Sequence, residues 1–388
     1  MMETKKIYYV CFYTEPECQN EVVSYPSVWS KIEYITAVIK KTGSAVEQLC
    51  IAPSLNGTIK GKIKIVDNCE RHIYLTSSYS QKKLVQIINA FIYKLRILFF
   101  LLKNVRENDK VLVYHSLFHK RWLWIYKKIF KRKFILEIED VFSELDNSSK
   151  KLKDREWQLI HLADAYLCIN ELVASKLSNN KKVIISYGNY SLPKLYQKEK
   201  MDKIRLVYAG VIEQERKAAF LAVDAMKGLP DTYELHILGF GDEKNIICLK
   251  KEIDEINNLR GKQVVFLHDR KSGEQYYKFL QTCDIALSTH SYDESNMNAA
   301  DNTFPSKVLV YLANGLRVVA QQLECLQAST IGDLLYYYSS PNAQLLADVI
   351  RDIDLSDNYD SRTRIDELNR VFCQEVALLL EECGYADS

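Results

Sequence analysis

The sequence lacks a marked net charge and lacks closely spaced cysteines, and each absence excludes a class of protein. Its 52 basic and 50 acidic side chains nearly cancel, so the chain as a whole does not attract nucleic acid and any basic partner site must be local. The ten cysteines form no CxxC pair, and several lie in apolar runs. This distribution favours buried thiols in a reducing, cytoplasmic compartment over a disulfide framework or a zinc site.

Targeting segments, membrane spans and common catalytic motifs are also not predicted. Residues 1–6 run directly into an apolar segment, so no signal peptide is predicted. The closest candidate for a membrane span, 87–102, is interrupted by Lys94 and Arg96. No paired-carboxylate hydrolase pattern, metal-ligand cluster or nucleophile motif stands out, and therefore neither a metal nor a bound cofactor is predicted.

The sequence does contain a regular alternation of short apolar runs with helix-length segments. The runs at 7–13, 110–114 and 204–208 are typical of strands buried on both faces of a parallel sheet. Residues 54–72 are polar and turn-rich, which indicates a hairpin or an insertion. Helices are predicted at 28–41, 81–105, 117–130, 246–259, 342–353 and 361–380. We therefore predict an α/β fold of two doubly wound, Rossmann-like parallel sheets in tandem.

A charged segment without apolar periodicity, residues 191–202, predicts a linker between two domains. The N-terminal domain is then 1–190 and the C-terminal domain 203–360, followed by a helical segment, 361–388, that we expect to pack back on the first domain. In open parallel sheets, ligands bind beyond the carboxyl ends of the strands. A cleft between the two domains is therefore the expected site.

One stretch, 301–315, combines helix caps, a proline, an apolar helix and a glycine. Asn302 or Thr303 could cap the helix, and Pro305 is tolerated in a first turn because its missing N–H would be unpaired there. Gly315 fits the left-handed residue that often follows a helix.

The start of this helix suits an anion. Backbone N–H groups and the positive end of the helix dipole at Ser306 and Lys307 would favour a bound diphosphate. The alternative interpretation is an ordinary helix in an α/β domain.

Several loops resemble those of retaining GT-B fold glycosyltransferases, similar to glycosyltransferase family 4 members that assemble polysaccharides and capsules. Residues 210–217, GVIEQERK, are similar to the first loop of the nucleotide domain, 238–241 to a strand-end GxG loop, and 304–315 to the sugar-binding helix. In the first half, 136–143 and 186–190 match more loosely. The resemblance implies a GT-B fold and a nucleotide-sugar substrate.

The resemblance also implies roles for individual residues. A lysine that follows the first-loop glycine holds the donor diphosphate in such enzymes, and Lys217, with Arg216, matches it; His115 ends a first-domain strand near the expected sugar. Lysine and arginine charge can stabilise a leaving diphosphate without a metal. The implied donor-binding residues are Gly210, Gly239, Gly241, His268, Asp269, Arg270, Asn302, Thr303, Phe304, Pro305, Ser306, Lys307 and Val310. The implied acceptor-binding residues are Glu139, Asp140 and Gly188. The alternatives are surface lysines, a polar turn at 268–270, a structural histidine and helix caps.

The chain departs from the family pattern at two positions. Aligning the family glycine with Gly315 places Asn302 and Val310 where two glutamates commonly stand. The second glutamate accepts hydrogen bonds from ribose hydroxyl groups, which valine cannot do. Its loss would weaken donor binding by about 1.5–3 kcal/mol, unless an acid such as Glu294 or Asp301 replaces it.

Two basic and aromatic segments suggest a membrane surface. Residues 119–133 contain no acidic residue, and 91–106 place lysine and arginine among leucine and phenylalanine. Such segments suit a peripheral site at the inner face of the membrane, near a glycan or lipid-linked acceptor. The alternative is two ordinary helices that cover a sheet. The competing functions are a retaining glycosyltransferase and a non-catalytic GT-B module that partners another transferase; a GT-B epimerase finds little support.

Overall fold

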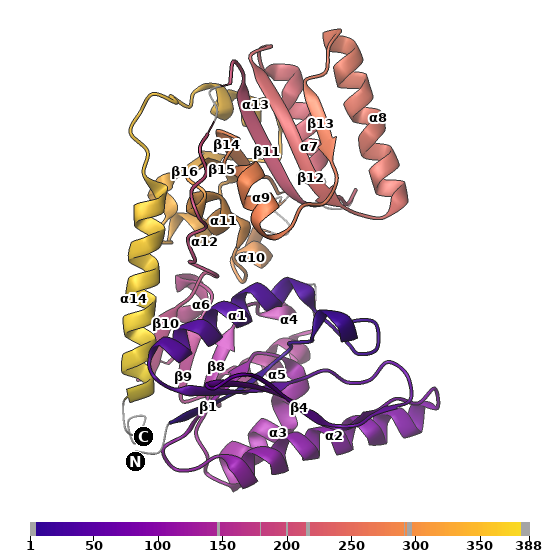
Figure 1. Ribbon diagram of the computed structural model, residues 1–388, viewed down its shortest axis with the longest axis vertical. Helices are drawn as coiled ribbons and strands as arrows, with labels where there is room; N and C mark the ends of the chain where they lie inside the picture. The colour runs from indigo at the N-terminus through magenta and orange to yellow at the C-terminus, as the bar shows by residue number, and fades with distance from the viewer. Residues whose placement is uncertain are drawn as a thin grey trace. The chain divides into compact units, whose positions relative to one another are not determined.

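The computed structural model of the protein describes residues 5–145, 148–178, 180–198, 201–214, 218–290, 292 and 297–381. The chain divides into two compact units (Figure 1). The first unit comprises residues 1–189 together with 370–388, and the second comprises 190–369. The segment 191–202, which the sequence predicts to be a linker, therefore falls in the second unit.

The first unit is built on an eight-stranded sheet in the order β10-β9-β8-β7-β1-β2-β5-β4. All neighbouring strands run parallel except β4, which pairs antiparallel with β5 at the edge. The strands are β1 (Lys6–Cys11), β2 (Ala45–Cys50), β4 (Lys62–Asp67), β5 (Glu70–Tyr74), β7 (Lys110–Tyr114), β8 (Ile135–Ile138), β9 (Ala165–Cys168) and β10 (Lys182–Ile185), and a separate ribbon pairs β3 (Thr58–Ile59) with β6 (Ser77–Ser78).

Helices cover both faces of this sheet, with α1 on one face and α2 on the other (Figure 1). Gln48 donates to Thr36 on α1, and Tyr8 donates to the Asn104 carbonyl of α2. Side chains that point to opposite faces of the sheet therefore contact the helix layers on those two faces. The helical segments are η1 (Pro16–Cys18), α1 (Pro26–Lys41), α2 (Lys83–Asn104), η2 (Leu117–His119), α3 (Lys120–Trp124), η3 (Ile125–Ile129), α4 (Phe142–Leu145), α5 (Lys150–Ile160) and α6 (Glu171–Ala174).

The second unit is built on a six-stranded, wholly parallel sheet in the order β13-β12-β11-β14-β15-β16. Its strands are β11 (Ile204–Val211), β12 (Tyr233–Phe240), β13 (Val265–His268), β14 (Ile285–Ser288), β15 (Arg317–Gln321) and β16 (Leu335–Tyr338). Its helical segments are α7 (Ala218–Ala225), η4 (Met226–Gly228), α8 (Glu243–Arg260), α9 (Gly273–Leu280), α10 (Met297–Ala300), α11 (Lys307–Ala313), α12 (Glu324–Gln327), η5 (Gly332–Leu334) and α13 (Ala343–Arg351), and α14 (Ser361–Glu381) begins in the second unit and ends in the first.

The apolar runs in the sequence explain why these strands form. Ile7 and Val10 on β1, and Leu206 and Val207 on β11, have no exposed surface because helices cover both faces of each sheet. The predicted α/β class with two Rossmann-like parallel sheets is confirmed.

The hairpin predicted within 54–72 is confirmed by β4 and β5, which pair antiparallel, and β5 also joins the main sheet beside β2. Two other local predictions need correction. The predicted helix at 117–130 is divided into η2, α3 and the π-helical η3, and Lys131 follows with a φ of 53°. The strand β16, within 335–338, has no counterpart in the sequence-based prediction.

The helix α2 is the one helix in the described part of the chain that is long and apolar enough to cross a membrane. Of its most apolar stretch, 22% is buried in the structure. Core helices of soluble proteins can have the same length and composition, so these two properties are weak support for a membrane span.

Candidate functional site

The expected donor loops lie at the carboxyl ends of neighbouring strands in the second unit. The strand β11 lies between β12 and β14, so the strand order reverses at β11, and parallel sheets bind ligands beyond such a reversal. Gly210 on β11 stands directly beside Gly239 on β12, and Leu238 stands beside His268 on β13. Three of the predicted donor loops therefore meet at one sheet edge.

The glycines of these loops are required by close packing. A Cβ on Gly239 would stand 2.7 Å from the Ile212 side chain and 2.9 Å from the Gly210 carbonyl oxygen. A Cβ on Gly241 would clash with the Ile212 carbonyl oxygen. The loops after β11 and β12 can approach each other this closely only because neither glycine carries a side chain.

Helix α11 is held against the first of these loops. The Tyr311 hydroxyl accepts a hydrogen bond from the Ala209 N–H at 3.0 Å and donates to the Ala209 carbonyl at 3.2 Å. At the start of α11, the Lys307 Nζ lies 2.6 Å from the place that a Cβ on Gly210 would occupy. The structure therefore brings two predicted donor residues, Lys307 and Gly210, together.

The segment before α11 differs from its prediction in the identity of the cap. The helix begins at Lys307, and Ser306 precedes it without a side-chain hydrogen bond to the helix. Asn302 and Thr303 lie in a turn four to five residues before the helix, so neither caps it. Gly315 has a φ of 80°, which confirms the predicted left-handed residue after the helix.

The packing of 302–306 is uneven. The Asn302 and Phe304 side chains are buried, Pro305 is partly buried, and Ser306 and Lys307 are exposed. The Pro305 carbonyl accepts a hydrogen bond from the Val308 N–H at 2.9 Å. The donor-binding role of this segment stays a prediction.

The turn at 268–270 is divided between buried and exposed groups. The His268 Nε2 lies 3.0 Å from the His236 Nδ1, and the His236 Nε2 accepts from the Arg205 guanidinium at 2.9 Å. Burial and the neighbouring cations lower the pKa of His268, and burial with Arg205 lowers the pKa of His236 to about 3. The His268 ring therefore takes part in a neutral, inward-facing pair of imidazoles.

The exposed groups of this turn remain accessible to a ligand. Asp269 and Arg270 are exposed, and the Arg270 guanidinium lies 5.0 Å from the centre of the half-exposed Phe240 ring. An exposed aromatic ring beside a guanidinium can stack with a planar base.

The remaining predicted donor and catalytic positions can be placed only in part. Lys217, Arg216 and Glu294 lie outside the described residues. Asp301 accepts the backbone N–H of Cys325 at 3.2 Å, and Val310 is partly buried in the middle of α11. The side chain of Val310 adds no acceptor at the position where the family glutamate is expected.

His115 in the first unit is enclosed. Its side chain has no exposed surface, its Nδ1 donates to the Asp140 carbonyl at 3.1 Å, and its ring stacks on Phe142. Burial lowers the pKa of His115, although the neighbouring Glu156 opposes this effect. These contacts hold the start of α4 and leave no imidazole surface for a sugar in this conformation; the catalytic role of His115 stays a prediction.

Glu139, a predicted acceptor residue, is tied to helix α1. Its carboxylate forms an ion pair with Lys31, whose Nζ also donates to the Ser186 carbonyl at 2.6 Å. Gly188, in the loop after β10, is buried, and the next residue, Asn189, donates to the Ser30 hydroxyl at 3.1 Å. Glu139 after β8 and Asn189 after β10 therefore both contact the N-terminal half of α1.

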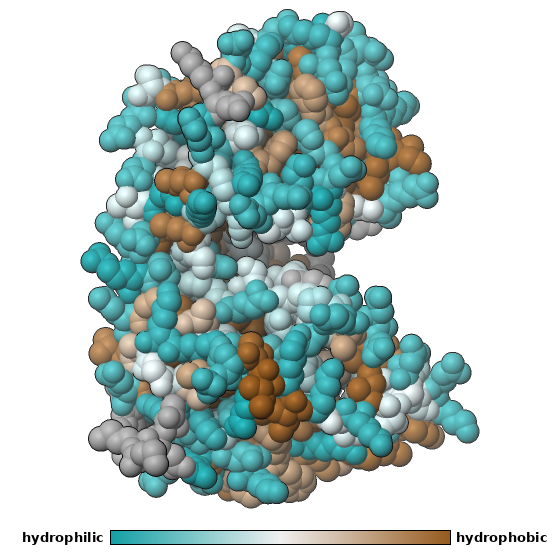
Figure 2. All heavy atoms as spheres, viewed as in Figure 1, coloured by the Kyte–Doolittle hydropathy of each residue, from teal (hydrophilic) through white to brown (hydrophobic). Residues whose placement is uncertain are grey.

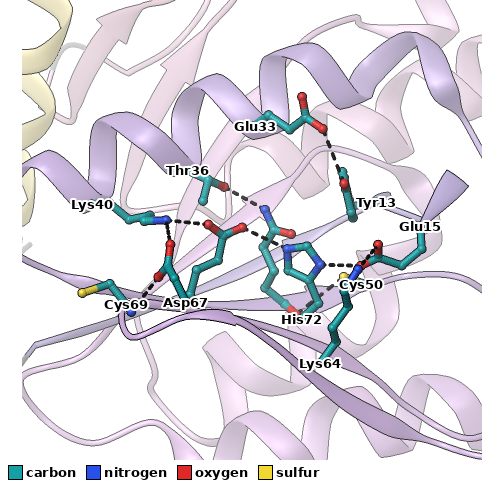
Figure 3. Close-up of polar contacts among 12 residues, drawn as sticks. Tyr13, Glu15, Glu33, Thr36, Lys40, Cys50, Lys64, Asp67, Cys69 and His72 are labelled. Atoms are coloured by element: carbon teal, nitrogen blue, oxygen red, sulfur yellow. Dashed lines mark hydrogen bonds and ion pairs between the residues drawn. The ribbon is translucent and has the colours of Figure 1, made fainter.

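Figure 3 shows a second group of polar residues in the first unit, which the sequence did not predict. The His72 Nδ1 lies 2.8 Å from the Glu15 carboxylate, and its Nε2 lies 2.9 Å from the Glu70 carboxylate. Lys64 and Lys40 complete the group by pairing with Glu15 and Glu70. These side chains come from the loop after β1, from β4, from β5 and from α1, so no short motif signals their meeting.

The charges of this group stabilise one another. Burial alone would lower the pKa of His72, but the hydrogen bonds that its ring donates to the Glu70 and Glu15 carboxylates outweigh burial and raise it. Burial would raise the pKa of Glu15, but Lys64 and His72 lower it. His72 therefore joins the loop that follows β1 to the edge of the sheet.

The described residues contain no group of three or more histidine, cysteine, aspartate or glutamate side chains arranged to hold a metal ion. The expectation of a metal-independent activity stays untested by this observation.

Two Rossmann-like parallel sheets in tandem, one with closely packed glycines at its strand-order reversal, are the arrangement of GT-B fold proteins. Residues 194–371 match the family model described as "Glycosyl transferases group 1". No curated protein matches the sequence. The predicted GT-B fold is confirmed by the solved structures, and the second half of the chain is similar to group 1 glycosyltransferases.

Those structures match along nearly their whole length. A trehalose-6-phosphate protein from E. coli, bound with UDP-2-fluoro glucose, has a TM-score of 0.62 at 12% identity, with 98% of each chain covered. An α,α-trehalose-phosphate synthase (UDP-forming) from Burkholderia xenovorans, in complex with glucose-6-phosphate, has a TM-score of 0.65 at 8% identity, with 96% of this chain and 98% of that chain covered. At such identities the similarity shows the fold alone.

Proposed function

We propose that the protein is a retaining, metal-independent glycosyltransferase that moves a sugar from a UDP- or GDP-sugar to a glycan or lipid-linked acceptor in cell-surface polysaccharide or capsule synthesis. The site would lie in the cytoplasm, at the inner face of the membrane where a lipid-linked acceptor is presented. One observation carries the proposal: the Lys307 ammonium group lies on the first-loop glycine, Gly210, at the sheet edge where the strand order reverses.

The chemistry of glycosyl transfer explains why this observation matters. When the bond between the sugar and the nucleotide breaks, negative charge develops on the leaving diphosphate. A lysine held beside backbone N–H groups at a strand end stabilises that charge more in the transition state than in the substrate, because the developing charge is greater. Lys307 supplies such a cation, and we propose Lys217 and Arg216 as further cations for the same diphosphate.

The nucleoside would lie along the neighbouring loops. We propose that the base stacks near Phe240 and Arg270, whose ring and guanidinium are 5.0 Å apart. The ribose would then approach α11 near Val310. Because Val310 cannot accept a hydrogen bond from a ribose hydroxyl group, donor affinity is expected to be modest.

Val310 also favours a second candidate function, a non-catalytic GT-B module that partners another transferase. A module that has lost catalysis keeps its fold, including the glycine packing of Gly239 and Gly241, but has no need for a ribose acceptor. The two candidates differ in whether the purified protein binds a nucleotide.

A thermal-shift series separates them. The protein would be heated with UDP, GDP and their common sugar conjugates, and any nucleotide that raises the melting temperature would be followed by an assay of labelled-sugar transfer to a membrane lipid extract. Stabilisation by a UDP- or GDP-sugar, followed by transfer, supports the enzyme. If no nucleotide in the series stabilises the protein, the enzyme hypothesis is excluded and the non-catalytic module remains.

A further inference from the structure

We propose that helix α2, together with the adjacent edge strand β4, forms a surface that inserts into an anionic phospholipid monolayer. The helix would lie in the plane of the membrane, without crossing it. The inference deepens the proposed function, on which it rests for the location of the acceptor.

The outer face of α2 is apolar where a soluble protein usually places polar side chains. Ile87, Phe91 and Phe99 are 58%, 53% and 61% exposed, and Leu84, Ile88 and Ile92 are exposed as well. At 100° per residue these side chains span about 140° of the helix surface. Tyr93, Ile97 and Leu101 lie outside this span and are buried against the unit, and Leu98, within the span near the end of the helix, is buried as well.

The edge strand β4 extends this apolar surface. Ile65 pairs with Arg71, Arg71 with Glu47, and Glu47 with Tyr8, so the four side chains point to one face of the sheet. Tyr8 contacts Asn104 at the end of α2, so that face is the one α2 covers. Ile63 and Ile65 remain 61% and 72% exposed there, and Figure 2 shows apolar side chains gathered over β4 and along α2.

The charges of this region favour a membrane over a protein partner. The sequence from Arg71 to Arg106 contains seven basic residues and no acidic residue. On the helical projection, Lys83 falls on one side of the apolar stripe, and Arg96 and Lys103 fall on the other. Lys94, beside Lys83, is partly buried, and its ammonium group lies 4.6 Å from the centre of the Phe118 ring. A helix with an apolar outer stripe edged by basic residues suits the interface of an anionic leaflet, where apolar side chains enter the acyl region and cations remain among the headgroups.

The neighbouring helix contributes residues of the same kind. The segment α3–η3 packs beside α2, and its Trp124, Ile129 and Phe130 are substantially exposed. Tryptophan is favoured at the headgroup level of membranes because its ring is apolar and its N–H is polar. Exposed apolar surface of this extent is uncommon on soluble monomers.

Vesicle flotation tests the proposal with the full chain. We expect the protein to float with vesicles of phosphatidylglycerol and phosphatidylcholine, to remain in solution with phosphatidylcholine alone, and to detach as salt is raised, because exposed charges are screened. Substituting Ile87→Glu together with Phe91→Glu is expected to lower binding at least about ten-fold, because two apolar side chains are lost from the inserted stripe.

The matched control places the same changes on another helix. Ile247 and Leu259 on α8 are 59% and 72% exposed, so Ile247→Glu with Leu259→Glu should leave flotation unchanged. Both double variants should keep the nucleotide-dependent thermal shift of the unaltered protein, which separates failure of membrane binding from failure of the proposed function.

Two results would overturn the proposal. One is equal flotation of the α2 and α8 variants. The other is a protein that ignores anionic vesicles and instead forms a dimer in solution that Ile87→Glu with Phe91→Glu dissociates, because the stripe would then be an interface between two copies of the chain.

Discussion

The Nζ of Lys307 lies 2.6 Å from the position that a Cβ on Gly210 would occupy. The Tyr208 hydroxyl oxygen lies equally close to the same position, at 2.6 Å. The missing side chain of Gly210 therefore leaves the space in which the ammonium group of α11 reaches the first loop. This relationship connects two segments, 204–211 and 307–313, that are about a hundred residues apart in the sequence.

Replacing the cation should weaken nucleotide binding while leaving the fold unchanged. Lys307→Met keeps most of the apolar length of the side chain and removes its charge, so we expect affinity for the bound UDP or GDP species to fall about ten-fold or more, as for loss of a charged hydrogen bond. Titration calorimetry measures the change. Lys251→Met, on the exposed side of α8, is the control, and equal affinity in the two variants would exclude a donor role for Lys307.

Two glycines of the donor loops should respond differently to alanine. At Gly210 the Cβ would meet the flexible end of Lys307 and the ring of the buried Tyr208, so Gly210→Ala should displace the lysine, weaken nucleotide binding and cost less stability than Gly241→Ala. At Gly241 the Cβ would meet the backbone oxygen of Ile212, so Gly241→Ala should cost about 1–3 kcal/mol of unfolding free energy. Chemical denaturation measures both variants; a larger loss for Gly210→Ala would contradict this packing.

Restoring an acid on α11 should strengthen nucleotide binding. Val310→Glu places a carboxylate where the family pattern expects the ribose acceptor, and we expect affinity to rise about ten-fold because a charged hydrogen bond to a hydroxyl group is gained. Val310→Leu is the control for side-chain size. Unchanged or weaker binding of the glutamate variant would count against the alignment that places Val310 at this position.

The His72 group predicts a pH dependence of stability. The pKa of His72 is raised, so its contribution to the unfolding free energy is fully present below its ordinary value of 6.5 and is lost as pH rises through the folded-state pKa. The pKa values of Glu15 and Glu70 are lowered, so their contributions are present above the ordinary value of 4.5 and are lost as pH falls through their folded-state pKa values.

The summed contribution of His72, Glu15 and Glu70 to the unfolding free energy is therefore largest between pH 4.5 and pH 6.5. We expect His72→Gln to destabilise the protein most near pH 5.5, by about 1–3 kcal/mol, and progressively less above neutrality. Denaturant unfolding of both proteins across this pH range measures the difference. A difference that is constant with pH would show that the His72 imidazolium is not the stabilising species.

The parts of the fold that the sequence predicted are those with a continuous local signal. The strand at 110–114 was predicted with its observed bounds, because strands buried on both faces are apolar at every position. The strand β16, within 335–338, was missed because it is a short tyrosine-rich segment whose two middle residues are only partly buried. The parallel pairing of β5 with β2 was also missed, since register between distant segments leaves no local pattern.

The residues of the candidate site were likewise predicted only where a local sequence signal exists. Gly210, Gly239 and Lys307 could be selected from loop positions, and the structure places them at neighbouring points of one sheet edge. The helix cap was wrong, because the chain makes a further turn between Asn302 and α11. The group around His72 could not be predicted, because its charges come from separate elements and meet only when those elements pack.

Hydrogen–deuterium exchange of the unaltered protein, with and without its stabilising nucleotide, would show whether the donor binds at these loops. We expect slower exchange of backbone amides at 208–212, 239–242 and 306–310 when the nucleotide is bound, with Lys307→Met reducing this protection at the same concentration. Protection confined to the first unit, or protection that is unaffected by Lys307→Met, would contradict a donor site at the carboxyl ends of β11 and β12.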